Sequence, residues 1–266
     1  PPGNPVFQII ARFFTMFTGP EHAALAVNAM SAICSALTIF FLYLTIVFFA
    51  RRIVGKGIGE YTVADAVAVI GSAVVGSLIY CFSDTFWFSA EEGEVYAMSS
   101  CFTAIVVWAM TKWYEQADQP YANRWILLIS FLMGLSIGVH LLNLLAIPVL
   151  VFMYFYRKRE TGHYTFWEYI MIFLLSIVIV GLVFFVIIPY LPKAAAYADL
   201  LFVNVFGLPY NTGAAFFMIA LLALCFWAAF LTYRKGMVMS NTVILSFTTI
   251  VIGFSVFSVI VIRSNV

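Results

Sequence analysis

Eight apolar stretches, each of roughly the length that crosses a membrane, follow one another along this chain. They cover residues 24–50, 63–83, 95–113, 125–140, 141–156, 166–190, 213–233 and 241–262. About 20 consecutive apolar residues let an α-helix cross the hydrocarbon core of a bilayer. Since backbone polar groups must be satisfied internally there, such stretches fold as helices. The sequence therefore predicts an all-α, polytopic transmembrane helix bundle of about eight spans, which forms one transmembrane domain over residues 1–266.

The composition supports this fold class and excludes others. Hydrophobic residues make up 64% of the 266 residues and charged residues 9%, whereas a soluble domain is about half apolar and about a quarter charged. A net charge of +1 gives no reason to expect a nucleic-acid partner. The sequence has no glycine-rich nucleotide loop and no zinc signature. We therefore expect membrane lipid as a partner, and we assign no metal ligands.

One pair of spans leaves two interpretations open. Residues 125–140 and 141–156 are both short, and His140 marks the break between them. The pair is either two tilted helices or one span with a re-entrant partner.

Two further segments are predicted to form interfacial amphipathic helices on the outer side of the membrane. Within residues 1–20, apolar residues recur at helical spacing opposite Gln8, Arg12 and Thr15. A helix of this length and pattern lies in the membrane interface instead of crossing it. The apolar side chains of residues 190–212 predict a second such helix.

The distribution of Lys and Arg orients the bundle, because loops on the cytoplasmic side carry an excess of both residues. One set of loops holds ten of them: Arg51, Arg52, Lys56, Lys112, Arg124, Arg157, Lys158, Arg159, Arg234 and Lys235. The opposite set holds Arg12, Lys193 and Arg263. We therefore expect the loop between the second and third spans, and His140, on the non-cytoplasmic side.

That loop, residues 83–96, is the first candidate for chemistry. Four of the twelve acidic residues of the chain fall within these fourteen positions: Asp84, Glu91, Glu92 and Glu94. Ser89 and Glu92 fit a capping box, in which Glu92 has a structural role. Glu94 is predicted to lie further into the next helix, where a carboxylate is costly unless a ligand or a cavity compensates it. Glu94 is therefore the preferred functional acid.

Two basic side chains are candidates for binding an anion. His140 stands at a span end on the side of the acidic loop and could donate a hydrogen bond or accept a proton. Arg263 is expected on the non-cytoplasmic side, where Lys and Arg are otherwise rare. Its guanidinium offers paired donors that suit a phosphate.

The sequence resembles one family in five places. These are Pro1-Pro2-Gly3-Asn4-Pro5, Phe86-Trp87-Phe88, Glu92-Gly93-Glu94-Val95-Tyr96-Ala97, Gly134-Leu135-Ser136-Ile137-Gly138-Val139-His140-Leu141-Leu142-Asn143 and Val261-Ile262-Arg263-Ser264. They are similar to protein O-mannosyltransferase-like enzymes of the GT-C superfamily. The similarity is greatest to a bacterial, Bacteroidetes-type branch long catalogued as a domain of unknown function. The stretch that ends at Asn143 is the most specific part.

The resemblance implies a membrane glycosyltransferase that uses a polyprenyl-phosphate sugar, mannose or a similar sugar, as donor. The acceptor would be a Ser or Thr hydroxyl of a periplasmic protein, at the outer face of a bacterial inner membrane. The resemblance leaves open whether the reaction uses a divalent metal. The family's general base would lie in an outer loop before Pro1, so we expect the chain to be an internal piece of a longer protein.

The resemblance also implies roles for individual residues. Glu94 and Glu92 are the catalytic candidates. The substrate-binding candidates are His140, Arg263, Pro2, Gly3, Asn143 and Tyr96.

Two alternatives to a glycosyltransferase remain at this point. A transporter or flippase for lipid-linked glycans needs a polar path, and charges near the membrane midplane are nearly absent from the sequence. A non-catalytic membrane subunit would use the acidic loop only as a polar cap.

Overall fold

The computed structural model describes residues 4–159 and 164–264, and every regular element in these ranges is helical. Seven helices are long and apolar enough to cross a membrane. The contacts divide the chain into two compact units: an N-terminal unit, Phe7–Gln116, and a C-terminal unit that consists mainly of Ala117–Val266. The predicted all-α polytopic bundle is confirmed.

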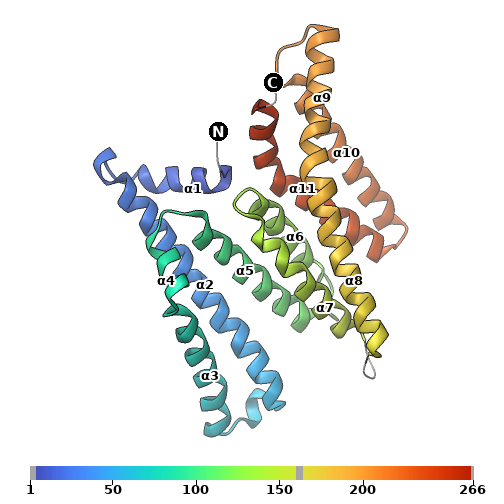
Figure 1. Ribbon diagram of the computed structural model, residues 1–266. Helices are drawn as coiled ribbons and strands as arrows, with labels where there is room; N and C mark the ends of the chain where they lie inside the picture. The colour runs from blue at the N-terminus through green and yellow to red at the C-terminus, as the bar shows by residue number, and fades with distance from the viewer. Residues whose placement is uncertain (1–3, 160–163, 265–266) are drawn as a thin grey trace. The chain divides into compact units, whose positions relative to one another are not determined.

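In the N-terminal unit, the long helix α2 (Ala23–Val54) packs against α3 (Val63–Cys81) and α5 (Val95–Gln116), and the short α4 (Asp84–Glu91) lies on α2 (Figure 1). Gly76 lets α3 approach α2 closely, because a Cβ atom there would lie 2.9 Å from Ile46 Cδ1. Gly55 ends α2 in the left-handed conformation, with φ of 68°, which costs glycine little. The acidic loop and the basic loop 55–62 therefore lie at opposite ends of this unit.

The C-terminal unit contains eight elements (Figure 1). They are α6 (Arg124–Ile137), the 3-10 helix η3 (Leu141–Ala146), α7 (Ile147–Lys158), α8 (Phe166–Leu182), the π-helical turn η4 (Val183–Ile187), α9 (Ile188–Phe206), α10 (Thr212–Arg234) and α11 (Val238–Ser264). Helix α11 crosses α6 at Gly134 and Gly253. Each of these glycines touches the backbone of the opposite helix. Small residues allow such close crossings in membrane proteins.

The predicted spans and the observed helices agree with one exception. Residues 125–140 form α6, whose 14 residues extend about 21 Å, which is short of the hydrocarbon thickness of about 30 Å. The chain breaks next to His140, as predicted, and η3 with α7 follows. Among the residues that the structure describes, seven helices thus have membrane-spanning length, whereas the sequence predicts about eight spans.

The segment 190–212 does not form a separate helix. Helix α9 continues from α8 through η4, so that Phe166–Phe206 is one run of 41 residues. At a rise of 1.5 Å per residue this run is about 60 Å long, about twice the hydrocarbon thickness. Pro189 supplies no backbone N–H and Pro192 lies inside α9. The wider π turn accommodates these prolines without ending the helix.

The interfacial segment at the start forms α1 (Pro5–Thr15), as predicted. Val6 and Ala11 are buried, while Ile9, Phe13 and Phe17 are exposed. Exposed side chains of this size on a short helix suit the apolar edge of a bilayer.

Thr62 starts α3 with a complete capping box. Its hydroxyl accepts from the backbone N–H of Asp65 at 3.2 Å, and the Asp65 carboxylate accepts from the backbone N–H of Thr62 at 2.9 Å. Thr62→Val removes this cap and is expected to lower the free energy of unfolding by about 1 kcal/mol. Unfolding titrations in detergent micelles measure the loss. Thr85→Val, the same change at an exposed position of α4, is the control; an equal loss in both variants would contradict a capping role.

Candidate functional site

The acidic loop, residues 83–96, is held in place by a ring contact with α3 and a close approach to α2. Phe86 on α4 is 6% exposed, and its ring centroid lies 4.5 Å from that of Tyr80. Gly93 lies so close to α2 that a Cβ atom there would be 2.9 Å from Val27 Cγ1 and 3.0 Å from Asn28 Oδ1. These contacts fix α4 and the start of α5 at the N-terminal end of α2.

The capping box predicted at Ser89 is wrong. Ser89 lies inside α4 and donates its hydroxyl to the carbonyl oxygen of Thr85 at 3.0 Å. Glu92 ends α4 with an extended backbone. The prediction that Glu94 lies inside the next helix is also wrong, because α5 begins at Val95 and Glu94 is exposed just before it. The burial of Phe86 favours helix from Asp84 onward, and the close approach of Gly93 to α2 places the break there. Neither Glu92 nor Glu94 is therefore used as a capping-box acid.

The four carboxylates of the acidic loop are all exposed. Glu91 accepts a hydrogen bond from Trp87 Nε1 at 2.6 Å. None of the four forms a salt bridge with another residue of the described ranges. The salt bridges that do form lie in the predicted basic loops: Lys56–Asp65, Lys112–Glu115, Arg157–Asp118 and Arg159–Glu168. Asp65, Glu115, Asp118 and Glu168 are thus paired with basic side chains, whereas the acids of the acidic loop are available to a ligand.

The second group of candidate residues lies at the corner between α6 and η3. His140 has an extended backbone and caps η3, because its Nδ1 accepts from the backbone N–H of Leu142 at 3.2 Å. This bond requires Nδ1 without a proton, so the neutral ring carries its proton on Nε2.

Asn143 stabilises this corner from inside. Its side chain is fully buried, and its amide donates to Ser136 Oγ at 2.8 Å. The Ser136 hydroxyl in turn donates to the carbonyl oxygen of Met133 at 2.8 Å. Asn143 Oδ1 is buried and has no hydrogen-bond partner among the residues that the structure describes. Ser136 was not among the predicted site residues, because its hydrogen bond with Asn143 forms across the turn after α6 and has no signal in the spacing along one helix.

The predicted site residues are divided between the two units. Glu92, Glu94 and the half-exposed Tyr96 belong to the N-terminal unit, and His140 and Asn143 belong to the C-terminal unit. Arg263 lies in the last turn of α11, and its side chain is outside the described part of the structure, as are Pro2 and Gly3. Their assignment as substrate-binding residues stays a prediction.

The acidic residues do not form a metal centre in the described ranges. No three His, Cys, Asp or Glu side chains of residues 4–159 and 164–264 lie in an arrangement that could hold a metal ion. The four cysteines are free thiols. We therefore assign no step of the chemistry to a metal.

These features define the class as a multi-pass, all-α membrane protein with an acidic loop at one end of a membrane-spanning unit. Residues 1–163 match the model of a protein family described as the protein O-mannosyl-transferase TMEM260 N-terminal domain, and the chain belongs to this family. The predicted resemblance to O-mannosyltransferases is thereby confirmed. Comparison with curated proteins and with solved structures gave no match.

Proposed function

We propose that the chain acts in a GT-C type membrane glycosyltransferase, which moves a sugar, mannose in the first instance, from a polyprenyl-phosphate donor to a Ser or Thr hydroxyl of a protein. Membership of an O-mannosyl-transferase family carries the proposal. The exposed acidic loop at one end of the N-terminal unit supports it. The ten-to-three distribution of Lys and Arg favours the non-cytoplasmic side for this loop. We assign the protein to the bacterial branch, in the inner membrane with its acidic loop facing the periplasm.

The reaction is an inverting displacement at the anomeric carbon of the sugar. The acceptor oxygen forms a bond to this carbon, and the bond from the carbon to the phosphate oxygen breaks. The electron pair of that bond leaves with polyprenyl phosphate, and a carboxylate takes the proton of the acceptor hydroxyl. Hydrogen-bond donors at the phosphate stabilise the charge that develops on the leaving group.

The described side chains suit these roles individually. Glu94 is exposed and unpaired beside the start of α5, where it can orient or deprotonate the acceptor hydroxyl, with Glu92 beside it. His140 is the candidate for the leaving phosphate, because it stands at a helix end on the predicted non-cytoplasmic side. Arg263, Tyr96, Asn143, Pro2 and Gly3 remain the other substrate-binding candidates.

The full-length protein in membrane vesicles tests the proposal. Vesicles receive radiolabelled polyprenyl-phosphate mannose and a Ser/Thr-rich acceptor protein, and the label in the acceptor is measured. Wild type is expected to transfer the label. Glu94→Gln is expected to lower the rate about 100-fold, because the amide keeps the size of the side chain but cannot accept a proton.

Glu21→Gln is the matched control, since Glu21 is an exposed acid just before α2 and lies outside the acidic loop. It is expected to transfer at the wild-type rate. Equal transfer by wild type and Glu94→Gln would support the assignment as a glycosyltransferase but reject Glu94 as a site residue. No transfer by wild type from mannose or related lipid-phosphate sugars would instead favour a non-catalytic subunit.

A further inference from the structure

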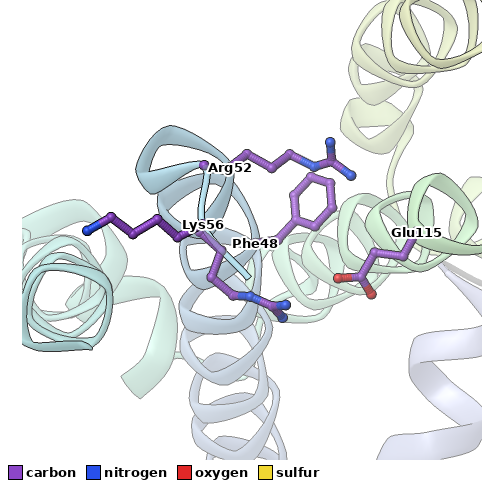
Figure 2. A pocket seen from close by; sticks show the side chains of 6 residues that line it. Phe48, Arg52, Lys56 and Glu115 are labelled. Atoms are coloured by element: carbon purple, nitrogen blue, oxygen red, sulfur yellow. The ribbon is translucent and has the colours of Figure 1, made fainter. Parts of the chain in front are cut away.

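A basic pocket lies at the end of the N-terminal unit away from the acidic loop (Figure 2). It is lined by Phe48, Arg51, Arg52, Gly55, Lys56 and Glu115, and its volume is about 320 Å³. This volume is within the range of small-ligand sites, about 300–1,000 Å³. Arg51 and Arg52 belong to the last turn of α2. The 23 residues from Asn28, beside the acidic loop, to Arg51 span about 35 Å, roughly one membrane thickness.

Two of the charges in the basic pocket are already neutralised. Lys56 Nζ bonds both carboxylate oxygens of Asp65, at 3.0 and 2.8 Å, and in Figure 2 it extends away from Glu115. The Glu115 carboxylate accepts from Lys112 Nζ at 2.9 Å. The pocket therefore keeps the positive charges of its two arginines.

The arginines are arranged to receive an anion. The Arg52 guanidinium lies over the rings of Phe48 and Tyr114, with its central carbon 4.7 and 4.1 Å from their centroids. Stacking holds the guanidinium in place and leaves its N–H groups at the edge. Neither Arg51 nor Arg52 forms a salt bridge with the parts of the chain that the structure describes. Guanidinium groups of this kind bind phosphate through paired hydrogen bonds.

The surroundings of the pocket indicate where the phosphate comes from. Ile53 and Phe49, on the same turns of α2, are 86% and 45% exposed, and Val63 at the start of α3 is 82% exposed. Apolar side chains beside a phosphate site at the end of a membrane-spanning helix would contact acyl chains. A soluble phosphate compound makes no use of them.

We propose that the basic pocket binds the headgroup phosphate of an anionic phospholipid, in the leaflet on the side of the basic loops. The paired N–H groups of Arg51 and Arg52 hold the phosphate, Phe48 forms the apolar floor, and the acyl chains lie along Phe49 and Ile53. Basic pockets between transmembrane helices are known to select such headgroups. This site is independent of sugar transfer, since it lies at the opposite end of α2 from the acidic loop.

The full-length protein in phosphatidylcholine nanodiscs, with and without phosphatidylglycerol, tests the proposal. Bound lipid is identified by native mass spectrometry after release from the disc. Wild type is expected to retain phosphatidylglycerol in preference to phosphatidylcholine. The double variant Arg51→Gln/Arg52→Gln is expected to weaken this retention at least tenfold. Inorganic phosphate added in excess is expected to leave the bound lipid in place.

Two matched variants separate the pocket from general electrostatics and from misfolding. Lys235→Gln removes an exposed positive charge of another basic loop and is expected to retain the lipid fully. Arg51→Lys/Arg52→Lys keeps both charges without the paired donors and is expected to weaken retention severalfold while thermal unfolding stays unchanged. Full retention by both double variants would overturn the proposal. Displacement of the lipid by inorganic phosphate would also overturn it, in favour of a soluble phosphate ligand.

Discussion

Asp199→Ala is expected to destabilise the C-terminal unit by about 3 kcal/mol, because it leaves buried backbone donors without an acceptor. Asp199 lies on α9 and is 2% exposed. Its Oδ2 accepts from the backbone N–H of Asn211 at 3.0 Å, and its Oδ1 accepts from those of Gly213 and Ala214 at 3.0 and 3.3 Å. The carboxylate thus caps the N-terminus of α10 from a neighbouring helix.

The local sequence cannot replace this cap. Asn211 stands at the N-cap position of α10 with φ of 72° and makes no side-chain capping bond. A negative charge at a helix N-terminus is also favoured by the helix dipole. Gly213 leaves room for α9, since a Cβ atom there would lie 2.2 Å from the carbonyl oxygen of Ala198. The turn between α9 and α10 therefore depends on one acid and one glycine.

The measurement is the free energy of unfolding in detergent micelles, for Asp199→Ala, Asp199→Asn and wild type. Asp199→Asn keeps one acceptor oxygen but loses the charge. Its free energy of unfolding is therefore expected to lie between those of Asp199→Ala and wild type. Glu21→Ala, which removes an exposed carboxylate, is expected to change stability by less than about 0.5 kcal/mol. A loss of that small size for Asp199→Ala would show that water satisfies the donors.

The role of Asp199 shows which kind of contact cannot be predicted from the sequence alone. It is an acidic residue in an otherwise apolar segment, which is a signal of a partnered group. The identity of its partners depends on how α9 and α10 pack, and their backbone donors have no sequence signature. Apolar length, by contrast, is a local property. For that reason seven of the eight predicted spans correspond to helices of membrane length.

Two of the capping-box patterns in the sequence make the same point. Thr62-Val63-Ala64-Asp65 and Ser89-Ala90-Glu91-Glu92 share the pattern of a hydroxyl residue followed three positions later by an acid. The first forms the box, and the second lies within and just after α4. The pattern identifies helix starts only where the preceding residues leave the helix. At Ser89 they do not, because the contacts of Phe86 and Gly93 with other helices decide where α4 begins and ends.

For the candidate site, the sequence identified a charged loop but not its geometry. The concentration of acids within residues 83–96 is visible in the composition alone, and the structure adds that these acids lack salt-bridge partners in the described ranges. The hydrogen bond from Asn143 to Ser136 became visible only once the turn after α6 was known. Side chains that meet across a turn or between helices are not encoded in any spacing along one element.

Gly134→Ala is expected to cost about 3 kcal/mol, because the added methyl group would meet backbone and not a side chain that can move. A Cβ atom at Gly134 would lie 2.3 Å from the carbonyl oxygen of Ile250 on α11. From the other side, a Cβ atom at Gly253 would lie 2.5 Å from the carbonyl oxygen of Phe131. The close approach of α6 and α11 therefore depends on glycine at both positions.

Gly71→Ala is the matched control, since a Cβ atom at Gly71 on α3 meets nothing within 4 Å. It is expected to be neutral or to stabilise by up to about 1 kcal/mol, because alanine is the better helix former. Unfolding titrations in detergent micelles compare the two variants and Gly134→Ala/Gly253→Ala. The double variant is expected to lose less unfolding free energy than the sum of the losses of the two single variants. One separation of α6 from α11 relieves both clashes. Full additivity would mean that the two glycines pack independently. A loss for Gly134→Ala no larger than that for Gly71→Ala would mean that α6 and α11 do not cross this closely.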